Sequence, residues 1–274
     1  MIFSMKQTIS VYKIEDKSNF GFLPRDYSRF KFGDALIGKQ FGKLLAKAFI
    51  DHYLIHQEAN KKFIAYSSPY QYIPTATMTM FEEFVFQTNR WLVSKNRSVL
   101  ETCRIYRNNT YSQDYGELSA AERLELIGSD LFYLDPNRAM GKTLLLLDDI
   151  KITGSHEYVL NRTLHHLNIN QEAIFLYFAE MVNPGINPNF ENYLNYDAVK
   201  SLNDLAQLIN SDNFVFNTRA IKYILSSNLV DLALFTSQLT DNQIVEIYNL
   251  AISNNYFEIP EFIESLAYLQ SKIK

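Results

Sequence analysis

The sequence predicts an α/β fold, with a mainly parallel sheet and helices on both of its faces, followed by an all-helical C-terminal region. Three observations support this prediction. Segments of strand and helix character alternate through residues 1–196, which is typical of parallel strands joined by helical crossovers. Residues 144–147 are four consecutive leucines, as expected of a central strand that is buried on both faces. From residue 197 onward the spacing of apolar residues is helical, with no convincing strand.

Within the first 196 residues, apolar side chains follow either the two-residue period of strands or the spacing of helices. Strands are expected at 8–14, 61–68, 98–106, 130–134, 142–149 and 171–182. Helices are expected at 32–55, 78–93, 118–127 and 154–168. Ser119 and Glu122 match a capping box at the start of the third helix.

The C-terminal region, 197–274, is expected to be a helical appendage on an α/β domain formed by residues 1–196. Its helices are expected at 197–210, 218–227, 229–237, 240–253 and 259–273. It carries 5 basic and 9 acidic residues, whereas residues 1–196 carry 21 of each, so charge also marks this boundary. The residues expected in its core are Leu205, Ile221, Ile224, Leu234, Ile244, Ile247 and Phe262.

Composition and charge limit the classes of function. The net charge of −4 gives no case for binding nucleic acid or a charged membrane surface. No apolar stretch reaches the roughly 18 residues that a membrane-spanning helix needs, and the first residues lack the pattern of a signal peptide. Cys103 is the only cysteine, which favours a reducing compartment, so we expect a cytoplasmic protein.

The loop after the four leucines, residues 148–156, combines two kinds of binding group. Ligands of open α/β sheets bind beyond the carboxyl ends of the strands. The backbone N–H groups of residues 153–156, where the next helix begins, favour an anion. Asp148 and Asp149 are costly on a buried strand unless they have a partner, and they offer acceptors to hydroxyl groups or to a metal. A phosphate next to a vicinal diol, as in ribose 5-phosphate, would satisfy both halves.

This loop resembles the ribose-phosphate motif of the type I phosphoribosyltransferases. The order of four apolar residues, an acidic pair, Ile-x-x and Thr-Gly is the same. The resemblance implies the same α/β fold. It also implies the residues that bind the ribose phosphate: Asp148, Asp149, Lys151, Ile152, Thr153, Gly154, Ser155 and His156.

Two further segments are similar to the ComF-like branch of this superfamily, and the similarity extends over residues 60–182. Upstream of the motif, the matching residues are Thr110, Gln113, Leu118, Ser119, Glu122 and Arg123, with about two extra residues in between. Residues 27–46 are similar to the ComF-like proteins found near tellurite-resistance gene clusters.

The chain departs from the family pattern at three places. Lys151 replaces an apolar residue and could add a charge near the ligand. His156 stands where Ser or Thr is usual, and it either donates an imidazole N–H to the phosphate or only starts a helix. The turn at 66–77, which is expected to handle the diphosphate, contains no Lys or Arg.

By resemblance, the protein transfers ribose 5-phosphate from phosphoribosyl diphosphate to a nitrogen of a base and releases pyrophosphate. Asp148 and Asp149 are the catalytic candidates, which would hold the ribose hydroxyls. Mg²⁺ would bridge those hydroxyls and the pyrophosphate, without a direct cage of side chains. We expect Asn at either position to reduce activity far more than stability, because it relieves repulsion in the empty protein.

A loop over residues 104–117 would close over the site and bring Arg104 or Arg107 to the diphosphate, although each could be a solvated surface charge instead. The implied partners are phosphoribosyl diphosphate and a nitrogenous base, and the chain could form a homo-oligomer. The sequence does not identify the base. Phe190 and Tyr193 could stack on it or simply pack.

The main alternative is a non-catalytic regulatory module that binds a ribose phosphate or nucleotide and contacts a partner through its helical tail. The absence of a basic residue from the turn at 66–77 favours this alternative. A third interpretation is an enzyme that cleaves or builds a glycosidic bond without the diphosphate.

Overall fold

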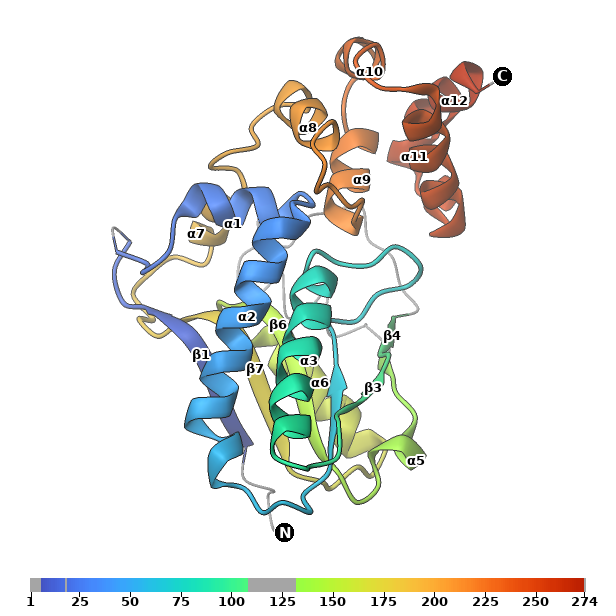
Figure 1. Cartoon of the computed structure of the whole chain (residues 1–274). Coiled ribbons are helices and arrows are strands. Elements are labelled where there is room, and N and C mark those ends of the chain that lie inside the picture. Colours follow the sequence, from blue (N-terminus) through green and yellow to red (C-terminus); the bar gives the residue numbers. More distant parts are fainter. Residues whose placement is uncertain (1–5, 18, 108–131, 274) are drawn as a thin grey trace.

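The structure is a computed structural model, and it describes residues 6–17, 19–107 and 132–273. Its centre is a five-stranded, fully parallel sheet with the strand order β1-β7-β6-β2-β3 (Figure 1). A separate antiparallel pair is formed by β4 and β5. The strands are β1 (Lys6–Ile14), β2 (Phe63–Tyr66), β3 (Glu101–Cys103), β4 (Tyr106–Arg107), β5 (Phe132–Tyr133), β6 (Thr143–Lys151) and β7 (Ala173–Met181).

Helices cover both faces of the sheet, and a helical tail lies beyond the carboxyl ends of its strands (Figure 1). The α-helices are α1 (Pro24–Lys31), α2 (Ala35–His52), α3 (Thr77–Ser94), α5 (Pro136–Ala139), α6 (Ser155–His166), α7 (Phe190–Asn195), α8 (Leu202–Ile209), α9 (Thr218–Leu225), α10 (Leu229–Thr236), α11 (Asp241–Ser253) and α12 (Ile263–Lys272). Short 3₁₀ helices are η1 (Leu54–His56), η3 (Tyr256–Glu258) and η4 (Pro260–Phe262). Within the described ranges, none of these helices has the length and apolar character to cross a membrane.

The leucine run of β6 lies in the middle of the sheet, between β7 and β2. Leu145 and Leu147 belong to the core formed with α2 and α3, whereas Leu144 and Leu146 belong to the core formed with α6. Successive side chains of a strand point to opposite faces, so a strand between two helical layers needs apolar residues at every position. The same alternation carries the next two side chains, those of the acidic pair, to opposite sides of the sheet.

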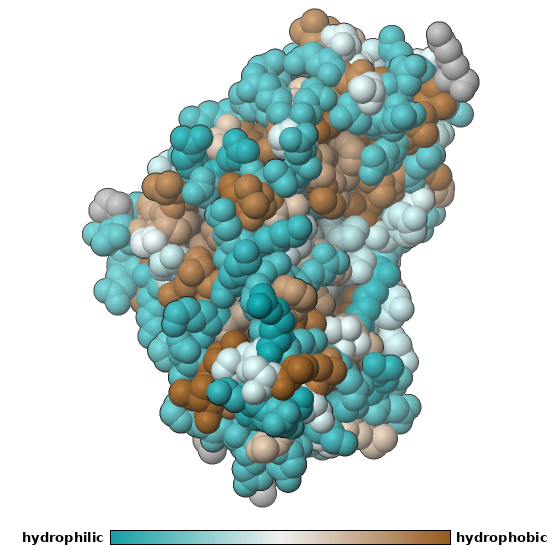
Figure 2. Space-filling view, viewed as in Figure 1, coloured by the Kyte–Doolittle hydropathy of each residue, from teal (hydrophilic) through white to brown (hydrophobic). Residues whose placement is uncertain are grey.

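The C-terminal region is helical, as the sequence predicts, and it has a core of its own that begins at Val199. Six of the seven residues expected in this core are buried, but Leu234 is 62% exposed and that expectation is wrong. Helix α10 is apolar around most of its circumference, and it buries Leu232 and Phe235 instead. Figure 2 shows apolar atoms at the upper end of the molecule, where Figure 1 places α10. The domain boundary at residue 196 stays a prediction.

The tail is tied to the turn at 66–77 by side chains that bond to its backbone. The Thr218 hydroxyl, at the start of α9, donates to the Ile73 carbonyl at 2.8 Å. The side-chain oxygen of Asn254 accepts from the backbone N–H groups of Tyr72 and Ile73, at 2.9 and 2.8 Å. Asn254 is buried, so these bonds satisfy polar groups that water does not reach. The tail therefore fixes the conformation of this turn.

A second anchor joins the tail to the junction of α1 and α2. The N–H of Ala35 donates to the Asn213 carbonyl at 2.8 Å, and the N–H of Val215 donates to the Gly33 carbonyl at 2.9 Å. Phe32, which precedes this junction, is fully buried within the core of the tail. Movement of the tail would therefore expose an aromatic side chain of the N-terminal part.

The structure differs from the expected elements in several places. The strand expected at 98–106 is divided between β3 and the start of β4, and the strand expected at 130–134 contains β5, which pairs with β4 outside the main sheet. Helices α1, α5 and α7 are not among the expected helices. The expected helix at 118–127 and the matches at Thr110, Gln113, Leu118, Ser119, Glu122 and Arg123 lie outside the described residues.

Helices α2 and α3 cross closely at glycines, and this crossing can be tested. A methyl group on Gly42 would overlap the backbone carbonyl oxygen of Met80 and lie 2.8 Å from Cβ of Glu83. We expect Gly42→Ala to destabilise the protein by about 1–3 kcal/mol, although Ala usually favours a helix. Gly38→Ala should be less harmful, because its main obstacle is the Thr79 side chain, which can rotate. Urea denaturation checks this order, and a stabilised Gly42→Ala variant would contradict the crossing.

Candidate functional site

A cavity of about 900 Å³ lies at the carboxyl ends of the central strands, lined by residues of the sheet domain and of the tail. Its lining includes every residue predicted to bind the ribose phosphate: Asp148, Asp149, Lys151, Ile152, Thr153, Gly154, Ser155 and His156. It also includes residues of α1, of the turn at 66–77, of α7 and of α9, which are remote from this loop in sequence. The structure thus brings the predicted segment together with the turn expected to handle the diphosphate, and with groups of α1 and α9 that were not predicted to lie there.

The loop from β6 to α6 has the geometry of an anion-binding helix start. Gly154 adopts the left-handed conformation with φ +75°, and α6 begins at the next residue. The hydroxyls of Thr153 and Ser155 lie 2.7 Å apart, and the Ser155 N–H points to Thr153 Oγ1 at 3.4 Å. Free N–H groups and the helix dipole favour negative charge at such a position. Gly154 is suited to this turn because other residues rarely adopt its dihedral angles.

Asp148 is fixed on the α6 side of β6 by three hydrogen bonds. One carboxylate oxygen accepts from the Ser68 hydroxyl at 2.7 Å and from the Asp149 N–H at 3.0 Å. The other oxygen lies 3.0 Å from Nδ1 of His156. Burial alone would raise the pKa of Asp148, but His156, Ser68 and the charge of Lys31 outweigh it and lower the pKa to about 2. Asp148 is therefore a permanently charged acceptor at neutral pH.

Asp149 lies on the other side of β6 and contacts α1. Its Oδ2 atom accepts from the Tyr27 hydroxyl at 2.8 Å and forms an ion pair with the Lys31 ammonium. Asp149 is only 5% exposed, and its burial raises its pKa against the opposing charge of Lys31, while Asp148 raises it further. Burial also raises the pKa of Tyr27 well above its usual value, which keeps this hydroxyl protonated as a donor.

Tyr27 and Lys31 are the main residues of the acidic-pair environment that the sequence analysis missed. They are four residues apart, so they project from the same face of α1. Pro24 in the first turn was a usable signal for the start of this helix. What no local pattern could show is that α1 packs beside the end of β6, which lies 118 positions later in the chain.

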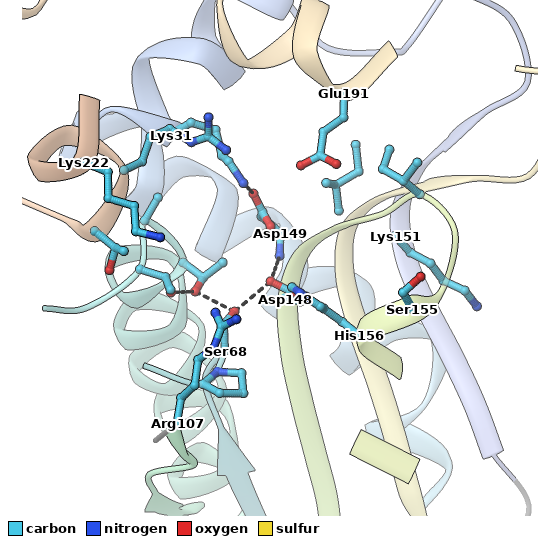
Figure 3. Close-up of a pocket in the computed structure, with 18 of the residues that line it drawn as sticks. Lys31, Ser68, Arg107, Asp148, Asp149, Lys151, Ser155, His156, Glu191 and Lys222 are labelled. Carbon is cyan, nitrogen blue, oxygen red and sulfur yellow. Dashed lines mark hydrogen bonds and ion pairs between the residues drawn. The ribbon is translucent and has the colours of Figure 1, made fainter. Parts of the chain in front are cut away.

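The structure assigns roles to the two residues that depart from the family pattern. His156 is the second residue of α6, and its ring bonds to Asp148, so it orients the acidic pair as well as forming part of the helix. The Lys151 ammonium pairs with Glu157 at 2.9 Å and with Glu180 at 3.2 Å. Burial opposes the charge of Lys151, but these two carboxylates outweigh it and raise its pKa. In Figure 3 this side chain points away from the acidic pair.

The turn at 66–77 presents hydroxyl groups to the cavity. Thr77 Oγ1 donates to Ser68 Oγ at 2.8 Å, and Thr75 Oγ1 lies 2.5 Å from Thr77 Oγ1. Because Ser68 in turn donates to Asp148, a chain of hydrogen bonds leads from this turn to the acidic pair (Figure 3). The turn can orient a ligand through these hydroxyls, but it supplies no positive charge.

The two arginine candidates for the diphosphate are placed differently. Arg107 lines the cavity, and Figure 3 shows its side chain beside Ser68. Arg104 is absent from the lining within the described part of the chain. Its guanidinium lies over the Tyr70 ring, 3.9 Å from the centroid, and donates to the Tyr70 carbonyl at 3.1 Å. The structure therefore favours Arg107 over Arg104 as a ligand-binding residue.

The segment after β7 lines the cavity through residues other than the two aromatic candidates. Phe190 packs on Phe20, with the ring centroids 5.2 Å apart, and Tyr193 is 52% exposed. Glu191, which is 7% exposed, and Asn192 line the cavity instead. A signal was present in the sequence, since three polar side chains flank these aromatic residues, but the sequence analysis weighed only the rings.

Helix α9 of the tail adds two positive charges. Arg219 and Lys222 both line the cavity, although the sequence analysis treats the tail as an appendage. They stand three residues apart, a spacing that places both on one side of a helix. The sequence offered one signal for a binding role of this helix, namely two basic residues three positions apart in a tail that is acidic overall.

No cluster of three or more His, Cys, Asp or Glu side chains able to hold a metal occurs among the described residues. Asp148 and Asp149 nevertheless offer carboxylate oxygens at the cavity wall. Mg²⁺ commonly keeps several waters and uses one or two carboxylates with the phosphates of a substrate. The donor set fits a magnesium ion held mainly by substrate oxygens, with the acidic pair reaching it through ribose hydroxyls or water.

Because Asp149 forms an ion pair with Lys31, the structure changes the effect on stability that is expected of Asp149→Asn. Asp149→Asn leaves the Lys31 ammonium without its counter-charge, so we predict a stability loss of about 3–5 kcal/mol in the ligand-free protein. Lys31→Met should also destabilise, and the double variant should lose less than the sum of the two. A double-mutant cycle in urea measures this coupling. Strictly additive losses would show that the pair does not act as a unit.

Asp148 should make the folded state sensitive to acid. Its folded pKa of about 2 is below the ordinary 3.8, so the unfolded chain binds this proton more tightly. The resulting stabilisation, about 2 kcal/mol, is complete above the ordinary pKa and is lost as the pH falls through about 2. Unfolding free energies of wild type and Asp148→Asn should therefore converge as the pH falls from about 4 to about 2. A gap that stays constant over this interval would assign the acid sensitivity to other groups.

Comparison with known proteins identifies the family. The family described as "PRTase ComF-like", where PRTase denotes phosphoribosyltransferase, matches residues 5–269. No curated protein matches the chain. Among solved structures, a hypoxanthine phosphoribosyltransferase from Staphylococcus aureus is similar at 11% identity and a TM-score of 0.32, over 53% of this chain and 72% of that chain. A variant of the Trypanosoma cruzi enzyme in complex with the product IMP is similar at 16% identity and a TM-score of 0.30, over 54% and 76%.

The family match extends beyond the similarity that the sequence analysis finds at residues 60–182, because it includes α1 at one end and the helical tail at the other. These are the two parts of the chain that supply Lys31, Arg219 and Lys222 to the cavity. The chain belongs to the ComF-like family of phosphoribosyltransferases.

Proposed function

We propose that this protein binds phosphoribosyl diphosphate and transfers its ribose 5-phosphate to a nitrogenous base, with release of pyrophosphate. The observation that carries the proposal is the shared cavity, in which the acidic pair of β6 and the N-terminus of α6 meet. Membership of the ComF-like family supports a role of the phosphoribosyltransferase type. The acceptor base and the Mg²⁺ requirement are part of the proposal.

The 5-phosphate would bind at the start of α6. Thr153 and Ser155 offer two hydroxyls 2.7 Å apart, and the backbone N–H groups of this turn offer further donors. Gly154 has no side chain to restrict the approach of a phosphate to the backbone. Lys151 is held by Glu157 and Glu180, so the loop binds the anion through dipoles and hydroxyls rather than through this charge.

The ribose would lie over the acidic pair. In the transfer, the bond from C1 to the diphosphate oxygen breaks and its electrons leave with the diphosphate. The new bond forms from the acceptor nitrogen to C1, and that nitrogen releases its proton to water. Positive charge develops on C1 and the ring oxygen in between, and Asp148 and Asp149 are anionic groups fixed in advance near that position. Magnesium bound to the substrate would neutralise the leaving diphosphate.

The acceptor would occupy the side of the cavity formed by α7. Glu191 is a nearly buried carboxylate there, and the side-chain oxygen of Asn192 is buried with no hydrogen-bond partner among the described residues. Both groups accept hydrogen bonds, which suits an acceptor that presents N–H groups. Pyrophosphate release that depends on an added base, measured across a panel of bases, tests the transferase directly.

A binding module remains the second candidate, and one observation favours it. The turn at 66–77 presents hydroxyls but no basic side chain to a diphosphate. Such a module would bind the ribose phosphate at the start of α6, and its regulatory effect would depend on whether this site is occupied. Binding of phosphoribosyl diphosphate without turnover, for every base of the panel, would support the module over the transferase.

Ligand-induced stabilisation tests the loop assignment. We predict that phosphoribosyl diphosphate with Mg²⁺ raises the melting temperature, by mass action worth about 2.7 kcal/mol at a hundredfold excess over Kd. Ribose 5-phosphate should give a smaller shift, because it lacks the diphosphate, and a nucleoside without phosphate should do little. Gly154→Val should abolish both shifts, because valine does not tolerate φ +75° and restricts the backbone.

A matched control separates ligand loss from backbone strain. Gly141 has a similar φ of +70°, lies outside the cavity lining and has open space around it. Gly141→Val should therefore lower the baseline melting temperature while keeping both ligand shifts. If neither phosphorylated sugar shifts the wild type at millimolar concentration, or if Gly154→Val shifts as wild type does, the loop assignment is wrong.

A further inference from the structure

We propose that the helical tail completes the diphosphate side of the site, and that Lys222 of α9 binds the diphosphate. This inference rests on the proposed function, and it assigns to the tail the positive charge that the turn at 66–77 lacks. The tail would then be part of the binding site rather than an appendage to it.

The position of Lys222 relative to the other groups supports this assignment. Figure 3 shows the Lys222 side chain on one side of the acidic pair, with Ser155 on the other. If the 5-phosphate binds at Ser155 and the ribose lies over Asp148 and Asp149, the substituent on C1 extends toward the opposite side. Arg107 and Lys222 both line the cavity there. The diphosphate would therefore lie between these two cations.

The positive charge that a diphosphate needs also supports the assignment of Lys222. A diphosphate carries several negative charges, and a site that binds it needs cations within contact distance. The turn at 66–77 offers only hydroxyls, and Lys151 is paired with two carboxylates. Helix α9 brings two of the five basic residues of the tail to the cavity, although the tail as a whole has a net charge of −4. Helix α9 thus places positive charge at the cavity, where the turn has none.

The start of α9 is fastened to the turn that it complements. The Thr218 hydroxyl bonds to the carbonyls of Ile73 and Pro74, at 2.8 and 3.1 Å. Asn217 caps the helix by accepting from the Ala220 N–H at 2.9 Å. Lys222 follows Thr218 by four residues, so it projects from the face of α9 that meets the turn. These bonds hold the Lys222 backbone in a fixed position above the diphosphate side of the cavity.

The Arg219 guanidinium lies beside aromatic rings of the N-terminal part and of α7. The Arg219 guanidinium lies 5.9 Å from the centroids of both Phe32 and Tyr196, so it is positioned beside rings that join the tail to α1 and α7. Planar guanidinium groups favour such positions, whereas the lysine ammonium acts as a point charge toward phosphate oxygens. We assign Lys222 to the diphosphate because Figure 3 places its side chain across the acidic pair from Ser155, whereas Arg219 helps to hold the tail against the cavity.

The test measures the binding of two ligands that differ only in the diphosphate. Lys222→Met keeps most of the apolar stem and removes the charge. Calorimetric titration should show that it weakens phosphoribosyl diphosphate with Mg²⁺ by at least tenfold, while ribose 5-phosphate binds as to wild type. Inorganic pyrophosphate should lose affinity in parallel. Lys222→Arg keeps a positive charge and should retain a large part of the affinity, which a loss caused by misfolding would not show.

Lys200→Met is the matched control, because Lys200 is an exposed lysine of the same tail outside the cavity lining. It should leave the binding of all three ligands unchanged. If Lys222→Met binds phosphoribosyl diphosphate as wild type does, or weakens ribose 5-phosphate equally, the inference is wrong while the proposed function stands. If wild type binds neither sugar phosphate, the proposed function itself fails, and this inference fails with it.

Discussion

The ion pair between Lys31 and Asp149 is the contact on which the arrangement of the site depends. Asp149 stands at the end of a strand that is buried on both faces, where an isolated carboxylate would be strongly destabilising. Helix α1 supplies the cation and, through Tyr27, a hydroxyl donor. Because α1 continues into Phe32, which is buried in the core of the tail, the same helix connects the acidic pair to the C-terminal region. One ion pair thus joins the sheet, α1 and the anchor of the tail.

The tail has a hydrophobic core of its own, yet its polar contacts are with the sheet domain at functionally placed positions. Thr218 and Asn254 bond to the backbone of the turn at 66–77, and Ser28 in α1 accepts from the backbone N–H groups of Ala198 and Val199. These directional contacts lie around the cavity and add to the apolar packing of Phe32 and Ile73 in the core of the tail. Such contacts fix geometry more than they add stability, since each neutral hydrogen bond contributes only about 1 kcal/mol. The family match over both regions agrees with a tail that evolved with the sheet.

The sequence best predicted those features that depend on residues adjacent in the chain. The central strand, the acidic pair and the start of α6 all follow from the pattern of residues 144–156, and each is confirmed in the structure. The partners of Asp149 were not predicted, because Tyr27 and Lys31 reach it only through tertiary packing. The prediction that Leu234 is buried was wrong for a related reason. An apolar helix such as α10 does not reveal from its own sequence which side is buried. Local pattern therefore identified one segment that lines the cavity, while long-range packing determined which charged residues lie around it.

The distribution of charge suggests why the acidic pair is bonded before any ligand arrives. Two adjacent carboxylates would repel a sugar bearing three phosphate groups as it approached. Lys31 offsets the charge of Asp149, and His156 does the same for Asp148 when its ring is protonated. Arg107, Arg219 and Lys222 then give the far side of the cavity a positive character that the turn at 66–77 does not provide. An anionic ligand could enter such a site, and in the proposed transfer the carboxylates would still lie in place to stabilise positive charge on the ribose. The binding of an anion and the stabilisation of a cationic transition state would otherwise make opposite demands on the same few residues.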